Sequence, residues 1–299
     1  MNRIMKNLLL TTVTLGLSVG SAFAADVLKP FTLGSKGPGT VAEKVAAAKT
    51  ALQANGFTIA GSYSPYPETT IIVVTNDEMK TTAAKSEHGG FGAAQRVSVT
   101  KVGNEVQVSY TTPAYMANGY RMASDLPQTA EKLKAALGNM EEFGAKGLKA
   151  SKLRKYHYMF GMEYFDEPVP LAEYGSYEEA VKAVEANLTT GKGDCTKVYR
   201  VDVTCKRDSV FRVAIKGGDK YMDDKYIMNM IDFNDLKGSA HLPHEMLVTG
   251  NKVIAQYARF RIALNFPDLK MSGANSFMKI MESPEAIKKA MIQAAGGKE

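Results

Sequence analysis

Alternating apolar and polar positions predict one antiparallel hairpin in each half of the chain. Residues 97–110 alternate with period two on both sides of a Gly-Asn turn at position 103, and residues 245–254 do so around the same dipeptide at position 250. Glycine supplies the positive φ of such turns, and the alternation marks the flanking strands. Upstream, the pattern predicts two more strands per half, at 57–64 and 69–75 and at 198–204 and 209–215.

Helical patterns with start and stop signals accompany these strands. Residues 40–52 form one amphipathic segment, and a second runs from Ser176 to Asn187. Ser176 is followed three residues later by Glu179, which is the spacing of a capping box. Two further helices begin at Pro127 and Pro284 and end before a glycine. Proline is typical of a first helical turn, and glycine of the position just beyond a helix end.

The two halves carry the same order of elements: a helix, two strands, a hairpin and a proline-led helix. The motif Ala117-Asn118-Gly119-Tyr120 recurs as Ala274-Asn275-Ser276-Phe277, at an offset of 157 that the following prolines share. Recurrent patterns of this kind indicate an internal duplication. Consecutive antiparallel strands with helices on one face predict an α+β fold of two similar antiparallel-sheet-plus-helix halves.

These boundaries place a first α+β domain at 25–137, a linker at 138–155 and a second α+β domain at 156–299. The linker holds glycines and five basic residues, namely Lys146, Lys149, Lys152, Arg154 and Lys155. We expect a solvated, partly helical segment. The alternative is contact of these basic residues with an anionic membrane surface.

Several features of the first half occur together: Gly56-Phe57 after a helix, a strand ending at Asn76, Arg96-Val-Ser-Val, and the run from Val102 to Pro113. With these features, residues 30–137 resemble the bacterial domain-of-unknown-function 302 family. A diverged second copy is expected at 156–296. The resemblance implies a small α+β domain with an antiparallel sheet. It implies no activity and no catalytic residue.

The amino terminus has the order of an export signal. Arg3 and Lys6 precede an uncharged stretch of about a dozen residues, and Ala22-Phe23-Ala24 forms a cleavage site. The stretch is shorter than the roughly 20 residues of a membrane span. We therefore expect a signal peptide at 1–24, cleaved after Ala24, and a periplasmic mature protein without a transmembrane segment. Its formal net charge falls from +6 to +4, and it would meet no nucleic acid.

Two lines of reasoning conflict for the two cysteines, Cys195 and Cys205. In an oxidising compartment a cysteine pair usually forms a disulfide. However, Tyr199, Val201 and Val203 alternate with Cys205 as on one face of a strand, and an extended run separates residues ten apart by roughly 33 Å. Bridged Cα atoms lie within about 7 Å. We predict the disulfide, with residues 196–204 reversing direction between the two cysteines.

Two segments are candidates for binding. His241, His244 and Met246 suit a soft metal such as copper, but Pro243 prevents a helix with one-turn spacing. We predict no metal centre there, with Met246 in a core and His244 at its edge in a strand that begins near His244. Alternation from residue 156 to 164 predicts a strand with an aromatic and methionine face that could hold an apolar ligand, formed by Tyr156, Tyr158, Phe160, Met162 and Tyr164.

No catalytic signature is present: the sequence lacks a nucleophile elbow, a phosphate loop, a dinucleotide fingerprint and a C-x-x-C pair. We therefore predict no catalytic residue and no cofactor. The leading hypothesis is a non-enzymatic periplasmic protein that binds a small molecule, or assists an envelope protein, through a groove between its halves. The alternatives are copper handling through histidine and methionine, a divergent enzyme, and a structural envelope component.

Overall fold

The computed structural model describes residues 27–203 and 205–298. The predicted signal peptide, residues 1–24, lies outside the described residues. Within them, no helix is both long enough and apolar enough to cross a membrane.

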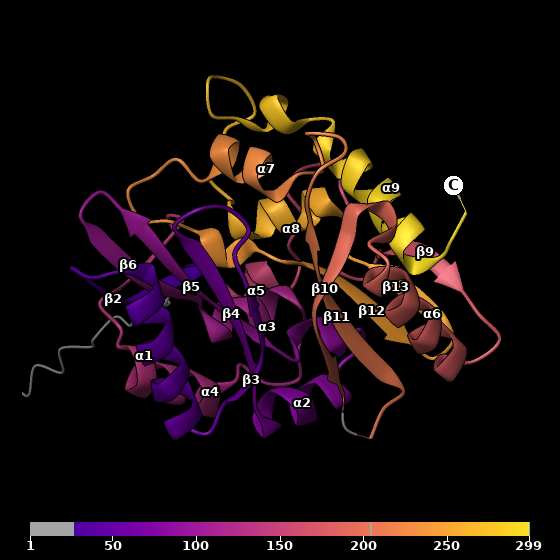
Figure 1. Cartoon of the computed structure of the whole chain (residues 1–299), viewed down its shortest axis with the longest axis horizontal. Coiled ribbons are helices and arrows are strands. Elements are labelled where there is room, and N and C mark those ends of the chain that lie inside the picture. Colours follow the sequence, from indigo (N-terminus) through magenta and orange to yellow (C-terminus); the bar gives the residue numbers. More distant parts are fainter. Residues whose placement is uncertain (1–26, 204, 299) are drawn as a thin grey trace, which may run out of the picture.

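The first half is built around one antiparallel sheet with helices packed on it, and its short strand β1 lies outside that sheet (Figure 1). Its strands are β1 (Val27–Leu28), β2 (Phe31–Gly37), β3 (Thr58–Tyr63), β4 (Thr69–Thr75), β5 (Gln95–Val102) and β6 (Glu105–Thr111). Its helices are α1 (Val41–Ala54), α2 (Asp77–Ala84), the short 3-10 helix η1 (Gly89–Gly92), α3 (Pro113–Gly119) and α4 (Pro127–Leu137).

The second half follows after a short connecting region. Its strands are β9 (Val169–Glu173), β10 (Cys195–Asp202), β11 (Asp208–Ile215), β12 (His244–Thr249) and β13 (Lys252–Ala255). Its helices are α6 (Tyr177–Thr189), η2 (Lys192–Asp194), α7 (Asp224–Ile231), η3 (Ser239–His241), α8 (Ala258–Asn265), η4 (Phe277–Ile280) and α9 (Ser283–Ala295).

The two main sheets have the same strand order when their strands are matched by position in the chain. The first runs β3-β4-β5-β6-β2-β7, and the second runs β10-β11-β12-β13-β9. Every pair of neighbouring strands in both is antiparallel. The predicted α+β class with antiparallel sheets is therefore confirmed.

Local signals place the helices close to where the sequence predicts them. Thr40 and Glu43 form a complete capping box at the start of α1. At α6, Ser176 accepts the Glu179 amide as expected. The Glu179 carboxylate, however, accepts the Gly175 amide at 3.0 Å, so it reaches one residue further upstream than a capping box requires.

Both predicted hairpins and both proline-led helices are present. Strands β5 and β6 pair across a turn in which Gly103 has a φ of 60°, and β12 and β13 pair across a turn in which Gly250 has a φ of 56°. Helices α4 and α9 carry their prolines in the first turn and are followed by Gly138 and Gly296.

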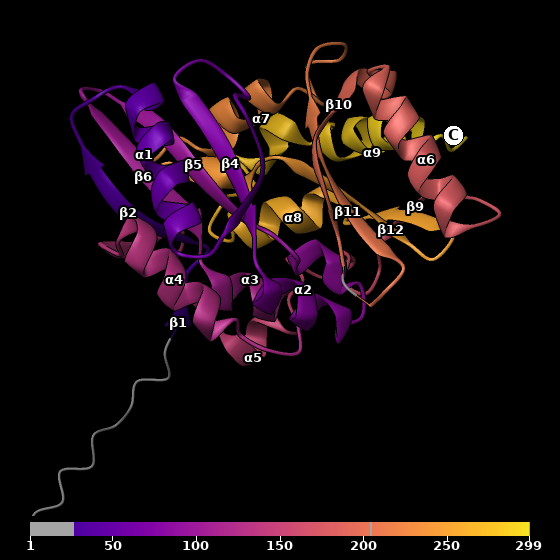
Figure 2. The ribbon, with the colours of Figure 1, turned by 60° about the horizontal axis from the view of Figure 1, so that its bottom comes forward.

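Helices cover the outer face of each sheet, and the other faces meet. Figures 1 and 2 show α1 with α4 on one side of the molecule and α6 with α9 on the opposite side. The contacts between the two halves are reciprocal: η1 of the first half packs on β11 and β12, and η3 of the second half packs on β4, β5 and β6. The buried apolar side chains consequently form one continuous core that extends over both halves.

The region expected as a linker, residues 138–155, contains regular structure. Strand β7 (Glu141–Phe143) pairs with β2 and extends the first sheet, and β8 (Leu148–Lys149) pairs with β1. A helical turn, α5 (Ala150–Leu153), follows. The five basic residues of the region are exposed.

Three sequence predictions are wrong. Residues 156–165 form a loop, with a turn at Gly161, instead of a strand. The repeated motif does not occupy equivalent places, because 117–120 ends α3 whereas 274–276 lies in a loop and Phe277 begins η4. The two cysteines are free. Because β10 runs extended from Cys195 to Asp202, it carries the chain away from the first thiol.

Candidate functional site

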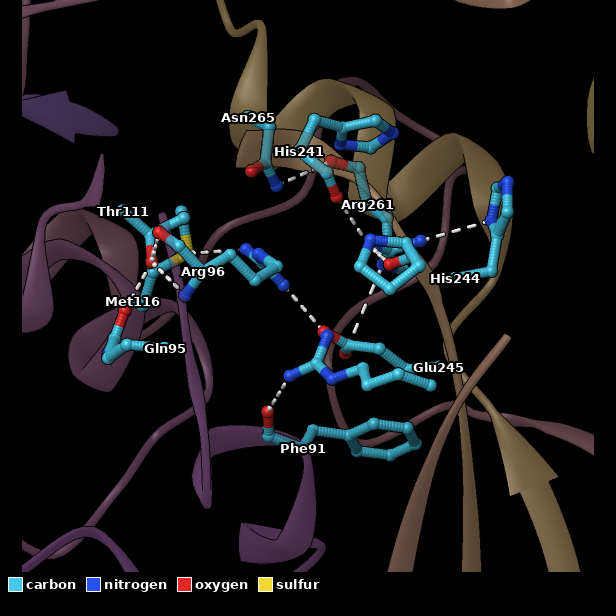
Figure 3. A network of polar contacts seen from close by, with 12 residues as sticks. Phe91, Gln95, Arg96, Thr111, Met116, His241, His244, Glu245, Arg261 and Asn265 are labelled. Atoms are coloured by element: carbon cyan, nitrogen blue, oxygen red, sulfur yellow. Dashed lines mark hydrogen bonds and ion pairs between the residues drawn. The ribbon is translucent and has the colours of Figure 1, made fainter. Parts of the chain in front are cut away.

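Three arginines are the largest fully buried side chains among the described residues. Arg96, Arg212 and Arg261 are each at most 2% exposed, and they surround Glu245, which is 1% exposed. Tyr120, at the end of α3, is 1% exposed and lies against the same group. We call these five residues the central cluster, of which Figure 3 labels Arg96, Glu245 and Arg261.

Strand geometry brings the cluster together at the junction of the halves. Arg96 is the second residue of β5 in the first half, and Glu245 is the second residue of β12 in the second half. Arg212 lies directly opposite Glu245 in the β11–β12 ladder. Because side chains alternate along a strand, Glu245 shares its face with Leu247. Leu247 packs against Gly90 of η1, so this face of β12 points toward the first half.

All three guanidinium groups form ion pairs with the Glu245 carboxylate. Nη1 of Arg96 lies 2.5 Å from Oε1 of Glu245, and Nη1 of Arg212 forms an ion pair with the same oxygen. Nε of Arg261 lies 4.0 Å from the other carboxylate oxygen, Oε2. Figure 3 shows Arg96 and Arg261 approaching Glu245 from different elements.

Neutral oxygens bind other guanidinium donors of Arg212 and Arg261. Arg212 donates from Nε to the Tyr199 hydroxyl at 2.6 Å and from Nη2 to the carbonyl oxygen of Phe91 at 3.1 Å. Arg261 donates to the carbonyl oxygens of His241 and Pro243, both at 2.9 Å. Such bonds hold the groups in place but add no negative charge.

His244 continues the network between Arg261 and Asp224. Its Nδ1 lies 3.1 Å from Nη1 of Arg261, and its Nε2 lies 3.1 Å from Oδ1 of Asp224. A guanidinium group can only donate, so Nδ1 accepts in this contact. The other carboxylate oxygen of Asp224 accepts from the Tyr63 hydroxyl at 3.4 Å.

The buried charges do not balance. Three guanidinium groups face two carboxylates, Glu245 and Asp224, which leaves one positive charge in excess. Burial, together with the neighbouring arginines, lowers the pKa of Arg212 and of Arg261 to about 10. Burial alone would raise the pKa of Tyr120. The positive charges of the three arginines outweigh this effect, and the pKa of Tyr120 is lowered.

The histidine and methionine candidates are buried. His244 begins β12 as predicted, and Met246 is fully buried in the core. The ring of His241 packs on Phe266 at 5.5 Å. Burial and the charge of Arg261 hold its pKa well below the usual value. Among residues 27–203 and 205–298, no three histidine, cysteine, aspartate or glutamate side chains gather as a metal site would require.

The aromatic segment at 156–164 packs against α8 and the loop after it. Tyr156 donates to the carbonyl oxygen of Ala263 at 2.9 Å, and Tyr158 donates to that of Leu269 at 3.1 Å. Tyr158 and Met162 line a cavity of about 10 Å³, room for about one water molecule. Phe160 is fully exposed, and Tyr164 is half-buried.

A larger hollow lies between α1 and residues 64–70, and we call it the α1 groove. It measures about 880 Å³ and is lined mainly by the first half, with Lys216 from the second half at its edge. Its apolar lining includes Val41, Val45, Pro65 and Tyr66.

Two lysines give the α1 groove a positive character. Lys49 donates to the Ser62 hydroxyl and Lys216 to the carbonyl oxygen of Ser64, both at 2.8 Å. The one acidic residue of the lining, Glu68, is paired with Lys101 at 3.0 Å. The charge of Glu68 is thus partly compensated, whereas both lysine ammonium groups contact neutral oxygens.

Sequence reasoning missed the central cluster, although a signal for it exists. Each arginine has an apolar neighbour in sequence: Arg212 lies between Phe211 and Val213, Arg261 lies between Phe260 and Ile262, and Arg96 precedes Val-Ser-Val. A charged residue inside an apolar run is buried only when it is paired. Such a position therefore marks a site even when its partner is distant in sequence.

Comparison with known proteins gives no match: no family model, curated protein or solved structure is similar to this chain.

Proposed function

We propose that this chain is an exported protein that binds an anionic, partly apolar small molecule in the α1 groove, without transforming it. The observation that carries the proposal is the groove itself: about 880 Å³, with an apolar lining and one lysine from each half. Pockets of this size hold small molecules, and a few polar groups within an apolar lining usually set their orientation.

The lining suits a ligand with an acidic head and an apolar body. Lys49 and Lys216 would bind the carboxylate, sulfonate or phosphate group, since hydrogen bonds between ionised groups are stronger than neutral ones. Val41, Val45 and Pro65 would contact the apolar part. The lining contains no histidine and no cysteine among the described residues, which favours binding over catalysis.

Two further parts of the proposal rest on sequence and topology. Export to the periplasm is supported by the signal sequence at residues 1–24. Internal duplication is supported by the shared strand order of the two sheets. It is also supported by the reciprocal packing of η1 and η3, because like elements meet in this way at a twofold interface.

The test of binding uses 1-anilinonaphthalene-8-sulfonate, a fluorescent apolar sulfonate. We expect one molecule to bind per chain. Lys49→Ala and Lys216→Ala should each weaken binding about two- to five-fold, since a solvent-exposed ion pair contributes up to about 1 kcal/mol. The matched control is Lys182→Ala, which removes an exposed lysine of α6 remote from the groove lining. Equal affinity of all four proteins would refute the α1 groove as the site.

Export has a separate test. The mature protein, isolated from the periplasmic fraction of cells that express the full chain, should begin at Ala25 when its amino terminus is sequenced. A chain that starts at Met1 and remains in the cytoplasm would disprove export and leave the groove proposal standing.

A further inference from the structure

A chain of hydrogen bonds leads from the α1 groove into the second half. Tyr66, which lines the groove, donates from its hydroxyl to the Ser239 hydroxyl at 3.0 Å, and Ser239 donates in turn to Oδ2 of Asp232 at 3.3 Å. The first bond joins the two halves, because Ser239 belongs to η3. Thr69 of the lining is a further hydrogen-bond neighbour of the Tyr66 phenol. We call Tyr66, Ser239 and Asp232 the relay.

The charge of Asp232 sets the direction of these bonds. An ionised carboxylate can only accept hydrogen bonds. Ser239 therefore directs its hydrogen at Asp232, and Tyr66 directs its own hydrogen at Ser239. In this state the Tyr66 hydrogen is engaged within the protein and is not available to a ligand in the α1 groove.

Protonation of Asp232 would reverse both bonds of the relay. Oδ1 of Asp232 accepts the Gly238 amide at 2.8 Å, so the added proton belongs on Oδ2, which faces Ser239. A protonated carboxyl group donates a hydrogen bond. Ser239 would then accept from Asp232 and donate to the Tyr66 oxygen, and the Tyr66 hydrogen would turn toward the groove. One proton enters from solvent, each hydroxyl keeps its own hydrogen, and no covalent bond of the chain breaks.

The surroundings of Asp232 place this change in the mildly acidic range. Burial raises the pKa of Asp232 to about 6, although the Gly238 amide and the charge of Lys237 act in the opposite direction. Burial also raises the pKa of Tyr66, so the phenol keeps its hydrogen. His241, which ends η3, stays neutral in this range, because burial holds its pKa well below the usual value.

The other charged groups nearby have partners outside the relay. Asp224 of α7, whose charge acts on the Tyr66 phenol, accepts from the Tyr63 hydroxyl. In the groove lining, Lys49 and Lys216 donate to oxygens of Ser62 and Ser64, and Glu68 is paired with Lys101. Asp232 is therefore the ionisable group that the hydrogen bonds connect to Tyr66.

We propose that the relay couples the α1 groove to the protonation of Asp232, so that Tyr66 donates a hydrogen bond to the acidic head of the ligand once Asp232 has taken up a proton. This inference rests on the function proposed above, in which Lys49 and Lys216 bind the same head. Tyr66 contacts the ligand, whereas Ser239 and Asp232 are positioning residues. Affinity for an anionic ligand therefore rises as the pH falls through about 6, and binding takes up protons in return.

The test follows the binding of 1-anilinonaphthalene-8-sulfonate from pH 8 to pH 5. The sulfonate stays ionised, so a change in affinity arises from the protein. We expect one molecule per chain throughout and an affinity about three- to ten-fold higher at the acidic end, because the ligand gains a hydrogen bond to a charged group. Calorimetry at pH 6, in buffers of different ionisation enthalpy, should show uptake of a fraction of a proton for each molecule bound.

Two variants fix the relay in either direction. Asp232→Asn keeps an acceptor for the Gly238 amide and turns an amide donor toward Ser239, as the protonated carboxyl group does. It should bind with the high affinity at every pH and without proton uptake. Tyr66→Phe keeps the ring but has no hydrogen to donate, so it should bind with the low affinity at every pH. The matched control is Tyr63→Phe, which removes a neighbouring phenol outside the relay and should keep the pH dependence of wild type.

The results separate the relay from the groove. Absence of binding at every pH would refute the α1 groove and the relay with it. One-to-one binding of wild type with the same affinity from pH 8 to pH 5 would overturn the relay and leave the groove standing. So would a pH dependence that persists in Asp232→Asn or in Tyr66→Phe. If Tyr66→Phe fails to fold, Asp232→Asn and the proton uptake of wild type still decide.

Discussion

Arg96 and Glu245 are 149 positions apart in the sequence, yet their side chains meet at 2.5 Å in the buried junction between the halves. Neither side chain is more than 2% exposed. Arg96 of the first half thus finds its carboxylate partner in the second half. The pair makes the two halves depend on each other for stability.

Replacing Glu245 should therefore destabilise the whole protein. Glu245→Gln removes the carboxylate and leaves three buried guanidinium groups without it, for which we expect a loss of about 3–5 kcal/mol in the free energy of unfolding. Urea denaturation measures this loss. The control is Asp166→Asn, which breaks the exposed pair between Arg121 and Asp166 and should change stability by about 0–1 kcal/mol. Similar losses in both variants would contradict the assigned role of Glu245.

Asp232 should make the protein less stable as the pH rises through the mildly acidic range. Burial raises the pKa of Asp232 to about 6, although its carboxylate accepts the Gly238 amide at 2.8 Å. The native state thus holds a proton that the unfolded state releases near pH 3.8, and the associated stability is lost between that pH and about 6. The stability difference between Asp232→Asn and wild type should therefore shift in favour of the variant, by about 2–3 kcal/mol, as the pH rises from 3.8 to above 6. Thermal denaturation measures this difference at each pH. A difference that does not vary with pH would refute the prediction for Asp232.

His241 should have the opposite effect on the pH dependence of stability and destabilise the protein as the pH falls. Burial, Arg261 and His244 hold its pKa well below 6.5, so below that pH only the unfolded state takes up the proton. The contribution of His241 to the free energy of unfolding is present above pH 6.5. It is lost as the pH falls, by about 1.4 kcal/mol for each pH unit. His241→Phe keeps a ring beside Phe266 but cannot be protonated. The difference between wild type and His241→Phe should therefore shift against wild type as the pH falls from 7 to 5, and a constant difference would argue against a neutral His241.

The two thiols should react in two stages. Cys205 is exposed, whereas Cys195 is fully buried, and burial raises the pKa of its thiol to about 12. We expect one thiol to react rapidly with a chromogenic disulfide reagent in the native protein and the second only after denaturation, both without reductant. Cys205→Ser should remove the fast phase. Absence of reactive thiol in the denatured, unreduced protein would mean that the cysteines are bridged after all.

The sequence predicted the elements that local physics determines. Thr40, Ser176, Pro127 and Gly103 mark helix starts or turns, because each acts on its own neighbours in the chain. Alternation located the strands of both hairpins for the same reason. These features required no knowledge of distant contacts.

The wrong predictions arise where contacts between residues far apart in the sequence determine the structure. Residues 156–164 alternate like a strand, but Tyr156 and Tyr158 bond to carbonyls of α8 and the following loop, and this packing fixes a loop. The disulfide was predicted from the expected compartment, whereas pairing of β10 with β11 keeps the cysteines apart. The partner of Arg96 could not be identified, since nothing near that arginine in the sequence indicates a carboxylate 149 positions later.

The separation of Arg96 and Glu245 in the sequence also sets a delay between their synthesis on the ribosome. Ribosomes add about 5–20 residues per second, so roughly 7–30 s separate the synthesis of Arg96 from that of Glu245. During this interval the first half has its strands but not the β12 and η3 that cover its inner face. An apolar surface left open for that long promotes aggregation. The nascent chain should therefore need a chaperone until the second half is complete, although the finished protein buries the same surface.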